Sequence, residues 1–362
     1  MGAKGGPTAG FTIGNRVIGG DAPCWVVAEV SANHNQSFAR ACDIIRAAKE
    51  AGADAVKLQT YTADTLTLES DREWFRIGGD SLWAGKTLYE LYGEAYTPWE
   101  WHPQLFEVAR SAGLECFSTP FDSTAVDLLE QCDVAVYKIA SFELVDVPLL
   151  KKVASTGKPV IASVGMASLA EIEEAVQTLR RYGAPSVALL KCTSAYPASP
   201  SDMNLRTIAH LADAFDVVAG LSDHTMGSHV AVAAVTLGAK IIEKHFTIRR
   251  ADGGPDSTFS MEPEEFAAMV RDIRQVESAL GRVSYTPTVP EAGNRVFRRS
   301  LFVVADVDKG EIFTELNVRS IRPGHGLHTR YLDTVLGRRA SCRIPRGTPL
   351  AWHHVEKSQS NE

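Results

Sequence analysis

A short apolar run rich in β-branched residues, followed by a segment with helical periodicity, recurs from residue 24 to about residue 280. Strands that alternate with helices form a parallel sheet, and eight such strands can close into a (β/α)8 barrel. We therefore predict an α/β fold of the TIM-barrel type; an open, doubly wound sheet is the competing architecture. The predicted strands are Trp25–Val30, Ala55–Gln59, Glu115–Thr119, Ala135–Ala140, Pro159–Ser163, Val187–Cys192, Val217–Leu221 and Lys240–His245.

Helical periodicity is clearest in five of the intervening segments, and two of these carry start signals. Pro98 follows Thr97, and proline fits the first turn of a helix. Glu264 and Glu265 follow Pro263, where acidic side chains stabilise the positive end of the helix dipole. The predicted helices are Phe38–Ala51, Pro98–Ala112, Leu169–Tyr182, Gly227–Leu237 and Pro263–Leu280.

The pattern changes after residue 283. A proline-containing stretch, residues 284–294, is typical of a linker, and short strand-like runs between glycine turns follow it. These runs, with a single helical segment at Tyr331–Leu336, predict a small, mostly β domain. Its predicted strands are Leu301–Val304, Glu311–Phe313, Val318–Ile321 and one near Pro349–Trp352. The predicted boundaries are a leader and N-terminal β segment (1–23), the barrel (24–283), the linker (284–296) and the small domain (297–362).

Two further segments stand out. The glycine-rich start, residues 1–10, resembles a leader or an artificial extension and carries no fold information. Almost forty residues separate the second predicted strand from the helix at Pro98, and loops of that length are uncommon and usually functional. Because this loop is rich in aromatic residues, we predict that it packs as a lid over the strand ends. The aromatic residues are Trp74, Phe75, Trp83, Tyr89, Tyr92 and Tyr96.

Composition excludes several classes of protein. The net charge of −7 argues against a nucleic-acid-binding surface, and the longest apolar run, residues 230–239, is too short to cross a bilayer. Six cysteines form no C-x-x-C pair, and five of them lie in apolar or helical stretches, as reduced thiols do in a cytosolic protein. The first twenty residues contain no apolar secretory segment. We therefore predict a cytoplasmic protein that binds neither nucleic acid nor membrane.

Each predicted strand leads to a polar residue at or just beyond its C-terminal end, and in a barrel these ends share one face. Lysines and hydroxyl groups that converge there predict a site for phosphate and carboxylate groups, since the ammonium is a compact charge and hydroxyls donate hydrogen bonds. The alternative is that the lysines form structural ion pairs with Glu29 or Glu243. The strand-end residues are Glu29, Lys57, Gln59, Ser118, Thr119, Lys138, Ser141, Ser163, Lys191, Thr193, Ser222, His224, Glu243 and His245.

Two histidines at strand ends predict a metal site. His224 and His245 close the seventh and eighth predicted strands, which are neighbours in a barrel, so that both imidazoles can bind one divalent ion. The alternative for each is a hydrogen-bonded structural group, and His34 is either a third participant or a turn residue. No dinucleotide fingerprint, P-loop, nucleophile elbow or H-E-x-x-H motif is present, so neither NAD nor ATP is expected as a cofactor.

The strand-end segments resemble those of the sialic acid synthase family, the nonulosonic acid synthases. The resemblance runs from about residue 15 to residue 355, and it includes the tail, where RRSL (298–301) and IRPG (321–324) resemble the family's antifreeze-like (SAF, β-clip) domain. The barrel segments that carry it are AEVSANHN (28–35), ADAVKLQT (53–60), STPF (118–121), YKIAS (137–141), KCTSAYP (191–197), GLSDHT (220–225), EKHFT (243–247) and GGPDS (253–257).

Within the family, WAGKTLYELY (83–92) and TPWEWH (97–102) look like the pseudaminic acid synthase branch. The neuraminate branch resembles the chain less in this region, and it typically carries Asn where this chain has Ser194. The pseudaminic precursor is a 6-deoxy, diacetamido sugar and is less polar than N-acetylmannosamine, which suits an aromatic lid.

The resemblance implies an enzyme that condenses phosphoenolpyruvate with an amino-sugar aldehyde and water, giving a nonulosonic acid and phosphate. For the pseudaminic branch the sugar is 2,4-diacetamido-2,4,6-trideoxy-L-altrose. The alternatives are N-acetylneuraminate or legionaminic acid synthesis, from N-acetylmannosamine or its 2,4-diacetamido-6-deoxy analogue. The residues implied to hold phosphoenolpyruvate are Lys57, Thr119, Lys138, Ser141, Ser163, Ser194 and Ser222.

The resemblance also implies roles for the other candidates. His224 and His245 would ligate Mn²⁺, with Mg²⁺ or Co²⁺ as alternatives, and the ion would polarise the aldehyde. Glu29 would stabilise the cationic carbon C2 or assist the water that adds there, and it forms the catalytic set with Lys57, Lys138 and Glu143. In the family the small domain reaches over the partner's barrel, which implies a domain-swapped homodimer. The residues implied to position the sugar are Gln59, Glu143, Tyr196, Asp256, Phe297 and Arg322.

Two rival functions remain open. A metal-dependent aldolase, or another phosphoenolpyruvate-condensing barrel, would use a similar set of residues, but an aldolase releases no phosphate. An inactive barrel that carries an ice- or glycan-binding module would keep its function in Glu29→Gln and His224→Ala variants. The sequence leaves open the stereochemistry of the sugar, the native metal and the destination of the product.

Overall fold

The computed structural model of the chain describes residues 10–79 and 82–357. It consists of two compact units, one up to Gly281 and the other from Arg282 on. Residues 1–9 of the predicted leader lie outside the described residues, so the interpretation of that segment stays a prediction.

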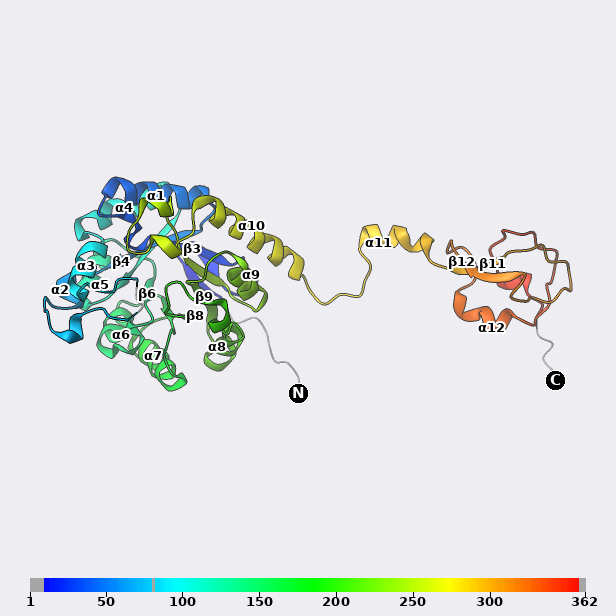
Figure 1. Ribbon diagram of the computed structural model, residues 1–362. Helices are drawn as coiled ribbons and strands as arrows, with labels where there is room; N and C mark the ends of the chain where they lie inside the picture. The colour runs from blue at the N-terminus through cyan, green and yellow to red at the C-terminus, as the bar shows by residue number, and fades with distance from the viewer. Residues whose placement is uncertain (1–9, 80–81, 358–362) are drawn as a thin grey trace. The chain divides into compact units, whose positions relative to one another are not determined.

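Eight parallel strands form a closed barrel in the first unit (Figure 1), which confirms the (β/α)8 fold and excludes the open sheet. Each strand pairs with the next one along the chain, and the last pairs with the first. All eight C-terminal strand ends therefore share one face of the barrel. The strands are β3 (Trp25–Glu29), β4 (Ala55–Thr60), β5 (Glu115–Pro120), β6 (Tyr137–Ile139), β7 (Val160–Ser163), β8 (Val187–Cys192), β9 (Val218–Asp223) and β10 (Ile241–His245).

Helices surround the strands (Figure 1), and the five predicted helices are all present. Pro98 is not in the first turn of a helix as predicted: its backbone is extended, a 3-10 turn follows at Trp99–Trp101 (η3), and α4 begins at His102. In the described part of the chain, no helix is both long and apolar enough to span a membrane. The helices are α1 (Phe38–Glu50), α4 (His102–Ser111), α5 (Ser123–Gln131), α6 (Val147–Ala154), α7 (Leu169–Tyr182), α8 (Thr207–Phe215), α9 (His229–Thr236) and α10 (Pro263–Leu280).

Local sequence fixes where α7 begins and ends. The Ser168 hydroxyl accepts a hydrogen bond from the backbone N–H of Glu171, and the Glu171 carboxylate accepts one from the N–H of Ser168. This capping box satisfies two of the N–H groups that lack a partner in the first turn. At the other end the chain turns away at Gly183, whose φ of +118° suits glycine.

The barrel and its helices share one apolar core. Inside the barrel, the rings of Trp25 and Phe117 stack with centroids 5.3 Å apart. A short antiparallel hairpin, β1 (Phe11–Ile13) and β2 (Arg16–Ile18), precedes the barrel and packs into the same core. The hairpin therefore belongs to the barrel unit.

The long loop after β4 is not without structure. It contains α2 (Ala63–Leu66), a 3-10 turn at Glu73–Phe75 (η2) and α3 (Leu88–Ala95), and α2 packs against α3. Both α helices begin with a capping box, formed by Thr62 with Thr65 and by Thr87 with Glu90. We call residues 61–96 the lid segment.

The second unit has its own apolar core and one antiparallel strand pair, β11 (Ser300–Val303) with β12 (Val318–Ile321). The strands predicted at 311–313 and 349–352 are only isolated bridges, because single residues pair there without a continuous ladder. The stretch predicted as a linker contains a helix, α11 (Val289–Asn294), which begins because Thr288 and Glu291 form a capping box. The predicted helical segment is a 3-10 turn followed by α12 (Leu332–Val335).

Candidate active site

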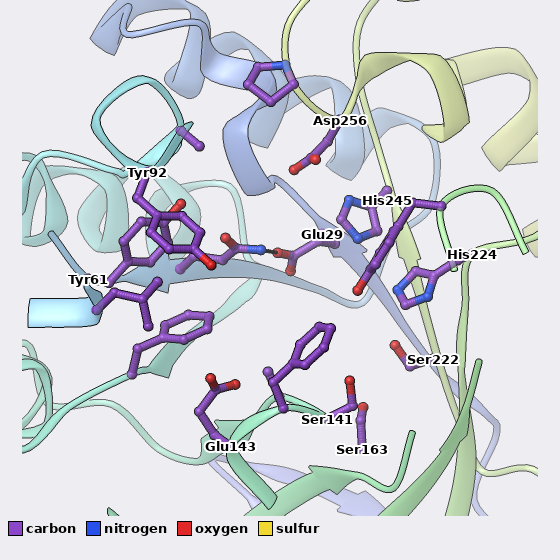
Figure 2. Close-up of a pocket in the computed structure, with 18 of the residues that line it drawn as sticks. Glu29, Tyr61, Tyr92, Ser141, Glu143, Ser163, Ser222, His224, His245 and Asp256 are labelled. Carbon is purple, nitrogen blue, oxygen red and sulfur yellow. Dashed lines mark hydrogen bonds between the residues drawn. The ribbon is translucent and has the colours of Figure 1, made fainter. Parts of the chain in front are cut away.

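A cavity of about 510 Å³ lies at the C-terminal ends of the barrel strands (Figure 2). The predicted site residues reach it from six strands and from the loops that follow them, because parallel strands deliver their last residues to one mouth. Twelve of these residues line the cavity: Glu29, Lys57, Gln59, Lys138, Ser141, Glu143, Ser163, Tyr196, Ser222, His224, His245 and Asp256.

Two residues predicted to hold phosphoenolpyruvate, Thr119 and Ser194, do not line the cavity. Thr119 lies directly behind it, where its hydroxyl accepts a hydrogen bond from Lys57 Nζ at 3.1 Å. Ser194 shares a hydrogen bond of 2.8 Å with Ser141. Phe297 and Arg322 belong to the second unit, where both are exposed, so their part in sugar binding stays a prediction.

Lys57 lies between two carboxylates. Its Nζ is 2.7 Å from Glu29 Oε2 and 3.7 Å from Glu243 Oε1, and Ser222 donates a hydrogen bond to Glu243. Burial alone would lower the pKa of Lys57, but Glu243 and Glu29 outweigh that effect and raise it. Lys57 therefore forms a buried ion pair, remains charged, and still lines the cavity.

Lys138 has no such partner. Its Nζ donates to Ser163 Oγ at 2.7 Å and to the Ile139 carbonyl at 2.8 Å, and among the described residues no carboxylate lies within 4.0 Å of it. Burial lowers its pKa, although Glu243 partly offsets the shift. A buried ammonium with only neutral partners is unfavourable, and a bound anion would relieve it. Lys138 and the neighbouring serines therefore form an anion subsite.

A glycine allows two of these hydroxyls to lie close together. Gly165, in the loop after β7, has a φ of +47°, and a Cβ there would lie 2.4 Å from the Cβ of Ser141 and 2.9 Å from Ser194 Oγ. Any larger residue would displace both hydroxyls, so the tight turn at Gly165 helps to shape the anion subsite.

Two carboxyl groups in the cavity titrate near neutral pH. Burial, with a smaller contribution from Glu243, raises the pKa of Glu29 to about 7 against the opposing effect of Lys57. Burial likewise raises the pKa of Glu143 to about 7, and its Oε2 has no hydrogen-bond partner among the described residues. Carboxyl groups with pKa values near the working pH are suited to acid–base catalysis.

The two strand-end histidines face each other, with ring centroids 5.4 Å apart. His224 Nδ1 lies 2.9 Å from the Thr193 carbonyl, which can only accept a hydrogen bond, so Nδ1 carries a proton and Nε2 is the nitrogen left to bind a metal. Burial, reinforced by the charges of His224 and Lys57, holds the pKa of His245 well below its usual range, so this ring is neutral. Its Nδ1 is buried without a partner in the described part of the chain. Burial alone would lower the pKa of His224, but the neighbouring Cys192 and the Thr193 carbonyl outweigh that effect and raise it. With Nε2 of His224 deprotonated, as metal binding requires, two imidazoles in this arrangement fit a divalent metal.

His34 does not belong to this pair. Its Nδ1 accepts a hydrogen bond from the Gln36 N–H at 3.2 Å, and its Nε2 lies 3.2 Å from the Thr97 hydroxyl. Both ring nitrogens are therefore occupied, and the side chain does not line the cavity. Of the two alternatives for His34, a third participant in the metal site or a turn residue, the structure therefore favours the turn residue.

A chain of hydrogen bonds links the remaining polar residues. Gln59 Nε2 donates to Glu29 Oε1 and to Ser31 Oγ, both at 3.0 Å, and the Ser31 hydroxyl donates to Asp256. Burial raises the pKa of Asp256. The ring of Tyr196 packs against that of His224 with centroids 4.4 Å apart. These side chains hold one another in place around Glu29.

Sequence reasoning missed two groups of residues. One is the aliphatic part of the cavity wall, Leu66, Ile77, Leu88 and Leu91 of the lid segment. The predicted aromatic lid is itself confirmed, since Trp83 and Tyr92 line the cavity. The other missed group is Cys192, which lines the cavity although it was interpreted only as a packed thiol. Lys191, in contrast, was predicted at the rim but does not line the cavity, because its Nζ folds back onto the Cys192 carbonyl at 2.6 Å.

A buried ion pair lies on the other face of the same strands. Lys244 and Asp223 are register partners on β10 and β9, and their side chains are bonded at 2.7 Å with side-chain exposures of 1% and 0%. The other Asp223 oxygen accepts hydrogen bonds from the N–H and the hydroxyl of Thr225. Since side chains alternate along a strand, this pair lies behind His224 and His245 rather than in the cavity.

Comparisons with known proteins agree with this geometry. The profile of the NeuB family matches residues 44–285, and that of the SAF domain matches residues 298–356. The pseudaminic acid synthase of Helicobacter pylori is 46% identical over 338 residues, which cover 93% of this chain and 99% of that protein. The N,N'-diacetyllegionaminic acid synthase of Legionella pneumophila is 38% identical over 353 residues, which cover 94% and 99%.

A solved structure is similar as well. The crystal structure of N-acetylneuraminic acid (sialic acid) synthetase from Leptospira borgpetersenii, in complex with citrate, has a TM-score of 0.71 at 33% identity. The match covers 80% of this chain and 95% of that one. The resemblance carried by the strand-end motifs is thus confirmed, and the chain belongs to the NeuB family, with a SAF domain after its barrel.

Proposed function

We propose that the chain is a pseudaminic acid synthase, which condenses phosphoenolpyruvate with 2,4-diacetamido-2,4,6-trideoxy-L-altrose and water to give pseudaminic acid and phosphate. The observation that carries the chemistry is the cavity, which combines the anion subsite at Lys138 with a pair of imidazoles and two carboxyl groups of raised pKa. The choice of sugar rests on the 46% identity to pseudaminic acid synthases over nearly the whole chain. Legionaminic acid synthesis is the alternative, at 38% identity.

Phosphoenolpyruvate binds, in this proposal, across the floor of the cavity. Its phosphate and carboxylate groups need cations and hydroxyl donors, and an anion beside Lys138 would favour the charged ammonium despite burial. The residues that we assign to this substrate are Lys57, Thr119, Lys138, Ser141, Ser163, Ser194 and Ser222.

Carbon C3 of phosphoenolpyruvate then attacks the aldehyde carbon of the open-chain sugar, which leaves positive charge on C2. The Glu29 carboxylate stabilises that charge and accepts a proton from the water that adds to C2. The aldehyde oxygen becomes a hydroxyl by taking up the proton that leaves the water. The tetrahedral intermediate then expels phosphate as its bond from C2 to the phosphate oxygen breaks, and the C2 hydroxyl gives up its proton to form the 2-keto acid. Gln59, Glu143, Tyr196 and Asp256 hold the sugar so that its aldehyde faces C3.

His224 and His245 would hold a divalent ion, Mn²⁺ or else Mg²⁺ or Co²⁺, and that ion supplies Lewis-acid polarisation of the aldehyde oxygen when bound. The described residues contain no group of three or more His, Cys, Asp or Glu side chains placed to hold a metal. The protein would therefore provide two ligands, and water and substrate oxygens the others. NAD and ATP have no role in this proposal.

The metal assignment predicts a loss of binding that is separate from activity. A His245→Ala variant should bind Mn²⁺ at least about tenfold more weakly than the wild type, because one of two protein ligands is lost. Isothermal calorimetry with Mn²⁺ alone measures this, and His34→Ala, which changes a histidine outside the cavity, is the control. Equal affinity in wild type and His245→Ala would refute the site.

An assay of phosphate release tests the proposed function. Purified protein with phosphoenolpyruvate and Mn²⁺ is offered the pseudaminic precursor, the legionaminic precursor 2,4-diacetamido-2,4,6-trideoxymannose, or N-acetylmannosamine. We expect the highest kcat/KM with the pseudaminic precursor. A preference for either other sugar would reassign the branch, and a keto acid formed without phosphate would indicate an aldolase.

We also propose that the enzyme works as a domain-swapped homodimer in which Phe297 and Arg322 of one subunit complete the cavity of the other. Both side chains are exposed in the second unit, as such a role requires. Co-expression of a Glu29→Gln chain with an Arg322→Ala chain tests the arrangement. In a swapped heterodimer one of the two sites is free of both substitutions, so random pairing should restore about a quarter of wild-type activity. Without a swap, every site carries a substitution and no activity returns.

A cytoplasmic location is proposed from the cysteines. All six are free, and five of them are buried, which suits a reducing compartment. Fractionation of the producing cells would test it.

A further inference from the structure

The cavity has two chemically different ends, as Figure 2 shows: His224 and His245 lie on one side, and Tyr61 and Tyr92 lie on the other, with Glu29 between them. At the tyrosine end the Tyr61 ring meets those of Tyr92 and Phe121 edge-on, with centroids 5.7 Å and 5.0 Å away. Tyr61 is only 3% exposed. This end is therefore a packed, largely apolar surface.

The lid segment supplies the aliphatic part of this end. Leu66 is the last residue of α2, and Leu88 and Leu91 belong to α3, the helix that also carries Tyr92. Glu143 lies at the edge of the apolar end: Tyr92 is close enough for the Glu143 charge to raise its pKa, after the larger effect of burial. A ligand group placed here meets methyl groups and aromatic rings on most sides, and the polar groups are the hydroxyls of Tyr61 and Tyr92 and the Glu143 carboxyl at the boundary.

The direction of the sugar follows from the proposed function. Its aldehyde carbon must lie between the histidine pair and the anion subsite, since the new bond forms there. The chain of the sugar then extends toward the tyrosine end, where carbons C4 to C6 would lie. Hydroxyl groups on those carbons would lose hydrogen bonds to water and find few partners, whereas methyl groups would be buried favourably.

We propose that Tyr61, Leu66, Leu88, Leu91 and Tyr92 form a specificity subsite for the far end of the sugar. It receives the C6 methyl group and the methyl of the 4-acetamido group, while Glu143 accepts a hydrogen bond from the acetamido N–H. The subsite selects 2,4-diacetamido-6-deoxy sugars over sugars with hydroxyls at C4 and C6, such as N-acetylmannosamine. It does not act on the stereochemistry of the sugar. This inference rests on the proposed function.

Two leucines in the lid segment provide a matched test. Leu66 lines the cavity and is half-buried, whereas Leu68, two residues on, is 55% exposed and does not line it. A Leu66→Asn variant should lower kcat/KM for the pseudaminic precursor by about tenfold or more, within the range for one methyl-sized contact in an apolar pocket. Its kcat/KM for N-acetylmannosamine should stay the same or rise, and its KM for phosphoenolpyruvate should not change. Leu68→Asn should match the wild type with both sugars.

A second pair of variants shows whether the effect of Leu66→Asn comes from the subsite or from misfolding. Leu88→Asn should behave as Leu66→Asn does, and Leu82→Asn, at a residue that is 52% exposed and outside the cavity lining, is its control. Circular dichroism of each variant verifies folding. If kcat/KM of these variants falls equally with both sugars, or falls with neither, the proposed subsite is wrong. The proposed function still stands in that case, provided that the wild type turns over the diacetamido sugar. A wild-type protein that releases no phosphate with any of the sugars overturns the proposed function itself.

Discussion

A Glu29→Gln variant is expected to lose between about 10²- and 10⁴-fold of kcat for phosphate release, the usual range for a positioned acid–base group. Glutamine keeps the size of the side chain and its hydrogen bond with Gln59, but it can neither hold a negative charge near C2 nor accept a proton from water. Folding should survive, because Lys57 keeps a second carboxylate, Glu243, at 3.7 Å. Steady-state kinetics with the pseudaminic precursor, together with circular dichroism, measures both effects.

The pH dependence gives a second readout for the same residue. Because burial raises the pKa of Glu29 to about 7, its carboxylate form is present above that pH and is lost as the pH falls through it. The kcat/KM of the wild type should therefore rise as the pH increases through about 7, and the kcat/KM of Glu29→Gln should not show this rise. Glu143 also has a pKa of about 7, so Glu143→Gln is the control: it should lower kcat/KM and keep this rise with pH.

The opposite results have clear meanings. If Glu29→Gln kept kcat within tenfold of the wild type, Glu29 would be an ion-pair partner of Lys57 and nothing more. If Glu143→Gln removed the rise with pH instead, the base would be Glu143.

The polar half of the site was predictable because two simple rules of strand geometry act together. Side chains alternate along a strand, and parallel strands bring their last residues to one face. Glu29 is thus in register with Lys57 on one neighbouring strand and with His245 on the other, although these residues are far apart in the chain. Local pattern is sufficient to place them once the barrel is assumed.

The apolar half was not predictable in detail. Leu66 and Leu88 belong to a segment that folds through short capped helices, and neither strand alternation nor a long helical period fixes which of its residues face the cavity. Leu66 and Leu68 illustrate the problem, since only the structure shows that the first lines the site. The helix α11 (Val289–Asn294) was missed for a related reason: a capping box outweighed the turn signal of Pro287 and Pro290.

Strand alternation also separates adjacent residues on one strand. Lys244 stands between Glu243 and His245 in the sequence, yet its side chain points to the opposite face of the barrel wall. A strand-end motif shows which residues are polar, but the faces that they occupy follow from the register alone. Lys244 and Asp223 consequently contribute to stability and lie outside the cavity.

A Lys244→Met variant should lower the free energy of unfolding by about 3–5 kcal/mol, because it leaves the buried carboxylate of Asp223 without its cation. The surface pair of Lys152 with Asp127 is the matched control: its N–O distance is 2.6 Å, but its side chains are 39% and 59% exposed. Lys152→Met should cost no more than about 1 kcal/mol, because water replaces the lost partner. Urea unfolding followed by far-UV circular dichroism compares the two.

The double variant Asp223→Asn, Lys244→Met separates the cost of an unpaired charge from the cost of lost packing. Asparagine retains an oxygen for the two hydrogen bonds from Thr225 and needs no counter-charge, so this variant should be more stable than Lys244→Met alone. If Lys244→Met cost no more than Lys152→Met, the carboxylate of Asp223 would have to be neutralised or solvated in the variant. His224 lies between Asp223 and Thr225, so a displacement of this backbone segment in Lys244→Met should also weaken Mn²⁺ binding. If Lys244→Met left the free energy of unfolding unchanged but weakened Mn²⁺ binding, the ion pair would serve the metal site rather than the stability of the fold.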